Sequence, residues 1–159
     1  MKYGLCNLSI VPLRFEDSDL SEMVSQVIYG DLFEIIEVTK KWCKIRLSTD
    51  QYEGWIDSKQ FVSISDTEFE QLSKLPLKLS THLLDVITTS SNTLLPISLG
   101  SNVSVSNFLN HSFEGDTNDN SFNKGNIIET AQMYLNSPYL WGGKTPFGID
   151  CSGFTQMVY

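Results

Sequence analysis

Apolar residues recur at two different periods along the chain, and this change of period limits the folds that the chain can adopt. Over residues 3–62 they form short runs separated by turn signals such as Gly30-Asp31 and Lys40-Lys41. The runs predict five strands: Tyr3–Leu13, Met23–Tyr29, Leu32–Thr39, Trp42–Leu47 and Tyr52–Asp57. Five short strands within about sixty residues indicate a small closed β-barrel, because closure removes the exposed edges that would pair with other chains.

The middle of the chain has a weaker pattern. Residues 66–74 predict a short helix that Asp66 caps, and Pro76 lies just beyond its end. Ser, Thr and Asn dominate residues 77–121, with apolar islands and turn clusters between them. We therefore expect residues 63–121 to form a linker helix and a second small β module.

A helical period begins near residue 127. Five apolar residues then share one helix face: Ile127, Ile128, Ala131, Tyr134 and Leu135. Asn126 is the predicted N-cap, with Glu129 as its capping-box partner. Pro138 ends this helix, a turn rich in Gly and Pro follows, and a second helix is predicted from Cys151.

Composition excludes several classes of function. Eleven Lys and Arg against 19 Asp and Glu give a net charge of −8, which disfavours binding to nucleic acid or to anionic membranes. The two histidines are far apart, and the three cysteines form no CxxC pair, so a zinc or redox site is not predicted. The start of the chain is unlike a secretory signal, and no apolar run is long enough to span a membrane, so a cytoplasmic location is expected.

Cys151 is the best candidate for a chemically active residue. It stands in the first turn of the predicted helix, with Asp150 as the cap, where unpaired N–H groups and the helix dipole favour the thiolate. A free cysteine is more often a small buried apolar residue. The residues alone therefore leave both interpretations open for Cys151, whereas Cys6 and Cys43 lie in strand patterns and are predicted to be buried.

Two stretches carry a resemblance to a known family. The run Tyr139-Leu140-Trp141-Gly142-Gly143, followed by Asp150-Cys151-Ser152-Gly153-Phe154, resembles the nucleophile segment of the NlpC-type cysteine peptidases. These bacterial enzymes cut γ-D-glutamyl amide bonds in cell-wall peptides. Upstream, the segments that resemble the bacterial SH3-like domain of such peptidases are Pro12–Arg14, Ser21–Gln26, Gly30-Asp31, Trp42 and Tyr52–Asp57.

The pairing is similar to that in the γ-D-glutamyl-L-diamino-acid endopeptidases, which recycle murein peptides. It implies an α+β fold, with one or two SH3-like β-barrels followed by the beginning of a papain-like NlpC-type peptidase domain. The expected boundaries are residues 1–62 for the first barrel, 63–121 for the linker helix and second module, and 122–159 for the peptidase part.

The resemblance also implies a role for each matching residue. Cys151 is the implied nucleophile, and the Tyr139 hydroxyl would lie beside it and help to bind the oxyanion. The implied substrate-binding residues are Asp150, Ser152, Trp141, Glu22 and Tyr52. Of these, Asp150 and Ser152 would bind the amino end of the substrate and Trp141 would form a cleft wall. Glu22 and Tyr52 would narrow the far end of the cleft and hold a free α-amine.

The implied substrate is the murein peptide L-Ala-γ-D-Glu-diamino acid, and no metal or cofactor is implied. The sequence departs from the family in one respect. The family's base histidine follows the nucleophile, whereas His82 and His111 both precede Cys151. The expected result is an inactive N-terminal fragment of a peptidase. Two alternatives stay open: an SH3-like module that binds wall peptides or a protein without catalysis, and an acyltransferase on the related fold.

Overall fold

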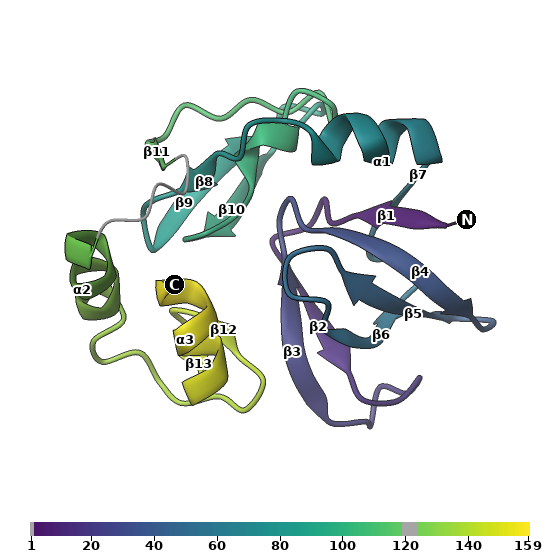
Figure 1. Cartoon of the computed structure of the whole chain (residues 1–159), viewed down its shortest axis with the longest axis horizontal. Helices are drawn as coiled ribbons and strands as arrows, with labels where there is room; N and C mark the ends of the chain where they lie inside the picture. Colours follow the sequence, from purple (N-terminus) through teal and green to yellow (C-terminus); the bar gives the residue numbers. More distant parts are fainter. Residues whose placement is uncertain (1, 119–123) are drawn as a thin grey trace.

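The computed structural model of the protein describes residues 2–118 and 124–159. These residues form an α+β structure in three parts. In Figure 1 a curved sheet lies on one side, a small second module lies above it, and a C-terminal segment with two helices lies beside the sheet. The predicted fold class is confirmed.

Seven antiparallel strands form the sheet, in the order β3-β2-β6-β5-β4-β1-β7. Their bounds are β1 Tyr3–Leu5, β2 Ile10–Arg14, β3 Met23–Ile28, β4 Leu32–Val38, β5 Trp42–Leu47, β6 Glu53–Asp57 and β7 Val62–Ile64. The outer strands β3 and β7 are not paired with each other. The barrel is therefore partly open, and the prediction of a closed one was wrong in this respect.

The predicted strand Tyr3–Leu13 is wrong, because two strands with different partners replace it. Strand β1 pairs with β4 and β7, whereas β2 pairs with β3 and β6. Between them the chain turns at Cys6, whose N–H donates to the Asp31 carbonyl and whose carbonyl accepts from the Gly30 N–H, both at 2.9 Å. These two hydrogen bonds tie Cys6 to a distant turn and interrupt the strand.

The barrel interior is packed by ten buried residues, among them Cys43, Ile45 and Leu47 from one face of β5. Burial of alternate residues along this strand confirms the period-two pattern of its sequence. A second apolar cluster joins the barrel to the second module. In it Leu5 and Tyr29 of the barrel pack with Ile87 and Val105. The two modules therefore share a core.

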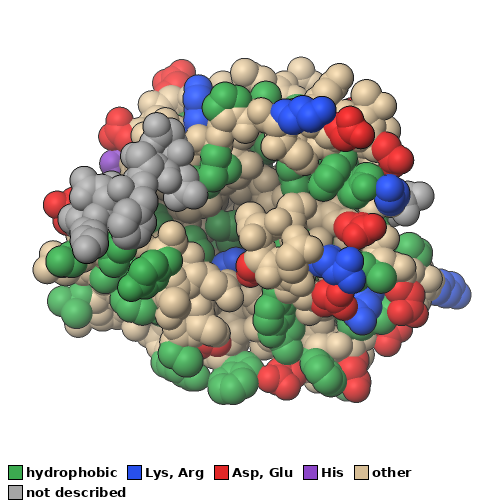
Figure 2. Space-filling model, viewed as in Figure 1, with side chains coloured by type: hydrophobic (Ala, Val, Ile, Leu, Met, Phe, Trp, Pro, Cys, Tyr) green, Lys and Arg blue, Asp and Glu red, His purple; other side chains and the backbone are tan. Residues whose placement is uncertain are grey.

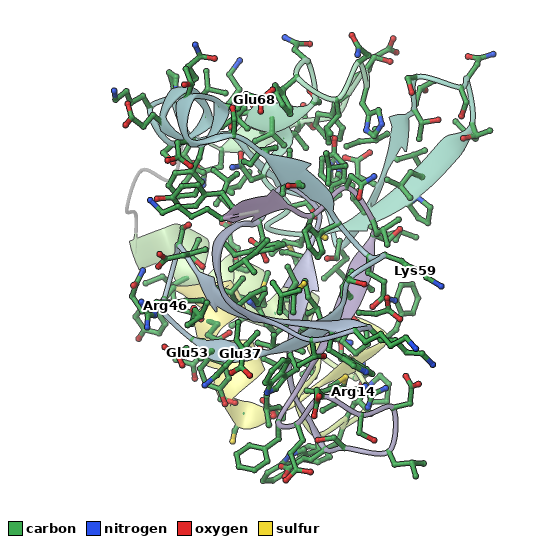
Figure 3. All side chains as sticks on the ribbon, turned by 90° about the vertical axis from the view of Figure 1, so that its right-hand side faces the viewer. Arg14, Glu37, Arg46, Glu53, Lys59 and Glu68 are labelled. Carbon is green, nitrogen blue, oxygen red and sulfur yellow. The ribbon has the colours of Figure 1, made fainter. Side chains whose placement is uncertain are left out.

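The outer face of the barrel carries ion pairs of moderate exposure. Arg46 donates to Glu53 through Nε at 2.9 Å (Figure 3), and it also lies 3.4 Å from Glu34. The hydrogen bond from Arg46 is the main reason that the pKa of Glu53 lies below its usual value. Because water screens such pairs, they contribute little to stability.

The second module begins with helix α1, Asp66–Ser73. Its N-cap is Ser65 and not the predicted Asp66, because the Ser65 hydroxyl accepts from the Glu68 N–H and the Glu68 carboxylate accepts from the Ser65 N–H. Strand β9 (Leu84–Thr88) then pairs with β10 (Leu94–Ser98), and β8 (Leu79–Ser80) pairs with β11 (Thr117–Asn118). A 3-10 helix, η1, spans Val103–Val105.

The C-terminal segment contains α2 (Lys124–Met133), the strand pair β12 (Lys144–Thr145) and β13 (Gly148–Ile149), and α3 (Cys151–Val158). Asn126 lies inside α2, so its prediction as the N-cap is wrong, and its side chain lies outside the described residues. Helix α3 begins at Cys151 with Asp150 as its N-cap, as predicted. Among the described residues, no helix has the length and apolar character needed to cross a membrane.

Candidate active site

The three cysteines differ in their access to solvent. Cys151 is exposed at the start of α3, whereas Cys6 and Cys43 are fully buried in the barrel. Burial is the main reason that the pKa of Cys6 rises to about 12, and it also raises the pKa of Cys43. Because the thiolate is the nucleophile, Cys151 is the cysteine placed for reaction.

This difference predicts that a native chain exposes one reactive thiol of its three. A thiol-exchange reagent at neutral pH should titrate Cys151 rapidly, and the other two should react only after denaturation. Peptide mapping by mass spectrometry would identify the modified residue. Rapid native labelling of Cys6 or Cys43 would contradict the burial of these two thiols, and Cys151→Ser provides the control.

Asp150 organises the backbone around the candidate nucleophile. Its Oδ1 accepts from the Gly153 N–H and from the Ser152 hydroxyl, each at 2.7 Å, and its Oδ2 accepts from the Gly142 N–H at 2.8 Å. Burial alone would raise the pKa of Asp150, but these hydrogen bonds bring it below the usual value. The carboxylate therefore stays ionised and holds the start of α3 against the preceding turn.

A hollow of about 160 Å³ lies beside Cys151. Its lining residues come from the barrel and from the C-terminal segment: Glu22, Val24, Tyr52, Trp141, Asp150, Cys151 and Ser152. Two parts of the chain that are distant in sequence thus meet at one site. A direct hydrogen bond joins them, because the Trp141 indole N–H donates to Glu22 Oε1 at 2.6 Å.

Six of the seven site residues predicted from sequence line this hollow, and Tyr139 does not. Tyr139 is 69% exposed, and its backbone forms a parallel bridge with Ile149. Its role beside the nucleophile stays a prediction. Sequence reasoning missed Val24, which also lines the hollow; a valine in a strand carries no signal that would have separated it from ordinary barrel residues.

The two histidines contact other parts of the chain. His111 Nδ1 lies 3.0 Å from the Tyr29 hydroxyl, and burial lowers the pKa of His111. His82 Nδ1 lies 3.3 Å from Asp85, and its Nε2 lies 3.6 Å from Asp116. Neither histidine lines the hollow beside Cys151. Within residues 2–118 and 124–159, no cluster of three or more His, Cys, Asp or Glu side chains could hold a metal ion.

The C-terminal segment presents several large apolar side chains to solvent. They are Ile128, Leu135, Tyr139, Trp141, Phe147 and Tyr159. Figure 2 shows such side chains gathered over α2. The buried residues Tyr134 and Ile149 of this segment cluster with Leu99 of the second module.

The two parts of the chain that line the hollow each match a known protein family. Residues 15–61 match the family described as the bacterial dipeptidyl-peptidase Sh3 domain, and residues 136–159 match the NlpC/P60 family. The chain is similar to NlpC/P60 peptidases that carry a bacterial SH3 domain. The resemblance read from the sequence is confirmed, and the two matched segments are the two that meet at the hollow.

Two curated relatives extend over most of the chain. A dipeptidyl-peptidase 6 from Lysinibacillus sphaericus is 27% identical over 91% of this chain and 64% of its own length. A γ-D-glutamyl-L-lysine dipeptidyl-peptidase from Bacillus cereus is 24% identical over 89% of this chain and 51% of its own length. The chain thus spans about half to two thirds of these relatives.

A solved structure shows the same fold. The crystal structure of an NlpC/P60 family protein from Bacillus cereus superposes with a TM-score of 0.75 at 18% sequence identity. The match covers 99% of this chain and 71% of that chain. The SH3-like domain and the C-terminal segment therefore have the arrangement of an NlpC/P60 protein.

Proposed function

We propose that this chain carries the nucleophile and the amino-end pocket of a cysteine peptidase that cleaves cell-wall peptides at the bond between γ-D-glutamate and the diamino acid. The observation that carries the proposal is the hollow at which Glu22 and Tyr52 of the barrel face Cys151 of α3. The two relatives, both dipeptidyl-peptidases, support the same class of substrate. No cofactor is part of the proposal.

The proposed reaction is an acyl transfer through the Cys151 thiol. The thiolate attacks the γ-carbonyl carbon of D-glutamate, a C–S bond forms, and the amide C–N bond breaks as the diamino acid leaves with a proton taken from solvent. Water then attacks the thioester carbonyl, a C–O bond forms, the C–S bond breaks to release the Cys151 thiolate, and the proton lost by the water passes to solvent. The N–H groups in the first turn of α3 adjoin the thiol, and Tyr139 stays the predicted side-chain donor to the oxyanion.

The amino end of the substrate would lie against the barrel. Among the described residues, Glu22 accepts a hydrogen bond from Trp141 through Oε1, so its Oε2 can accept one from an ammonium group. Asp150 adds a second negative charge, although three donors already occupy its oxygens. Tyr52 is 41% exposed in the lining and would close the end of the pocket.

These features predict a peptide with a free N-terminal L-Ala, as found in released fragments rather than in intact wall. The expected cytoplasmic location suits such a substrate and stays a prediction. The alternative functions differ in outcome: a binding module would hold the peptide without a covalent step, and an acyltransferase would pass the acyl group to a second amine.

An affinity label tests the proposal without requiring turnover. L-Ala-γ-D-Glu chloromethyl ketone should modify Cys151 with saturation kinetics, and free L-Ala-γ-D-Glu should protect against it. The C–S bond forms as the C–Cl bond breaks, chloride leaves and the thiol proton passes to solvent. Labelling without saturation, or labelling that the dipeptide does not slow, would contradict the proposed pocket. Cys151→Ser should remain unlabelled.

A further inference from the structure

The turn that precedes Cys151 lies along β3, an outer strand of the barrel (Figure 1). Contacts between them occur at three points, in the pairs Trp141–Glu22, Gly142–Met23 and Lys144–Gln26. Gly142 has φ +73°, and a Cβ there would collide with the Met23 carbonyl oxygen. The turn thus covers a strand edge that would otherwise be unpaired.

Gln26 makes the most enclosed of these contacts. Its Oε1 accepts the backbone N–H of Lys144 at 2.7 Å, and both residues are buried, at 8% and 7% exposure. A buried N–H without a partner is costly, so this hydrogen bond fixes where the backbone of the turn can lie. The donor is the main chain, and Gln26 is therefore the side chain that sets the position.

The same turn also holds the start of α3. Asp150 accepts from the Gly142 N–H at 2.8 Å, and its own N–H donates to the Gly143 carbonyl at 3.2 Å. Gly153 packs so closely on that carbonyl that a Cβ at this position would collide with it. A displacement of the turn would therefore displace Asp150 and, with it, Cys151.

We propose that Gln26 is a positioning residue, which fixes Cys151 relative to the barrel side of the substrate pocket. Glu22 and Tyr52 belong to the barrel, whereas Cys151 belongs to α3. The buried hydrogen bond from the Lys144 N–H to Gln26 links the barrel to the turn that precedes α3. The inference rests on the proposed function, in which the barrel holds the amino end of the substrate while Cys151 attacks its γ-carbonyl.

The test compares substitutions that keep the size of Gln26 but differ in their ability to accept. Gln26→Met has no comparable acceptor, whereas Gln26→Glu retains an oxygen for the Lys144 N–H. Gln71→Met, on the exposed face of α1, is the matched control. Each variant is treated with L-Ala-γ-D-Glu chloromethyl ketone, and the inhibitor constant KI is separated from the limiting rate kinact.

Gln26→Met should lower kinact about tenfold, because a small misplacement of reacting groups has effects of this order or larger. Its KI should stay within about twofold of wild type, because Glu22 and Tyr52 remain in place on the barrel. Gln26→Glu and Gln71→Met should retain the wild-type kinact. An unchanged kinact in Gln26→Met would overturn the proposal.

Hydrogen exchange gives a second measurement that does not depend on substrate. In Gln26→Met the amides of Gly142, Lys144 and Gly153 should exchange faster, with β4 and β5 unchanged. If the wild type shows no saturable labelling, the proposed function is wrong, and unchanged exchange at Lys144 would then also overturn the role of Gln26. Loss of protection throughout the barrel would overturn a role confined to the turn.

Discussion

The 159-residue polypeptide is expected to release diaminopimelate from L-Ala-γ-D-Glu-diaminopimelate roughly 10²–10⁴-fold more slowly than a peptidase with its base in place, because loss of a general base has an effect of this size. Both of its histidines are engaged elsewhere, His111 with Tyr29 and His82 with Asp85 and Asp116. In the proposed reaction the exposed Cys151 thiol would attack the carbonyl, but neither His82 nor His111 lines the hollow to give the leaving amine a proton.

Chromatographic detection of free diaminopimelate measures this rate, with Cys151→Ser as the control. Free imidazole in the buffer should raise the rate of the wild type and leave that of Cys151→Ser unchanged. Intact-mass spectrometry follows the acyl-enzyme at the same time. Turnover at an ordinary enzymatic rate that depends on Cys151 would contradict the prediction, whereas binding without acylation would favour the alternative of a binding module.

The local chemistry around Cys151 could be predicted from the sequence, because it depends on neighbours in the chain. Asp150 caps α3 through the N–H of Gly153, three residues away, and such short-range capping has a recognisable sequence pattern. The buried face of β5 was predictable for the same reason, since alternation is a local property. The cap of α3 and the buried face of β5 could therefore be predicted from neighbouring residues alone.

Features set by distant residues were not predictable from the local sequence pattern alone. The apolar pattern continues from Tyr3 to Leu13, and the break at Cys6 arises from its bonds to Gly30 and Asp31. Gln26 has a polar side chain of the kind usual at solvent-facing strand positions. It is buried because the turn that contains Lys144, far along the chain, packs on it. The cap at Ser65 shows a further limit, because Ser65 and Asp66 are both favourable N-cap residues and only the backbone distinguishes them.

Acetylation of the label's N-terminal alanine is expected to lower kinact/KI tenfold or more. A hydrogen bond to a charged group contributes roughly 1.5–3 kcal/mol, and the acetyl group removes the ammonium charge and adds bulk next to Tyr52. The measurement compares the free and the acetylated chloromethyl ketone on the wild-type chain. Equal values for the two labels would refute the proposed amino-end pocket, and with it the role of the barrel in specificity.

Two substitutions at Glu22 separate its charge from its contact with Trp141. Gln can still accept the indole N–H through its amide oxygen, so Glu22→Gln removes the charge alone, whereas Glu22→Ala removes both. The preference for the free label should therefore fall in Glu22→Gln while the Trp141 indole N–H stays protected from hydrogen exchange, whereas Glu22→Ala should lose both. Glu37→Gln, on an exposed part of β4, is the control and should retain the full preference.

The pH dependence of the same ratio tests whether the ammonium charge is what the pocket recognises. An α-amino group loses its proton near pH 8, so the advantage of the free label should be complete well below that pH and should decline as the pH rises through it. Both labels react with the same thiol, so its own reactivity cancels in the ratio. A preference that is constant from pH 6 to 9.5 would mean that Tyr52 excludes the acetyl group by size, and that Glu22 recognises no charge.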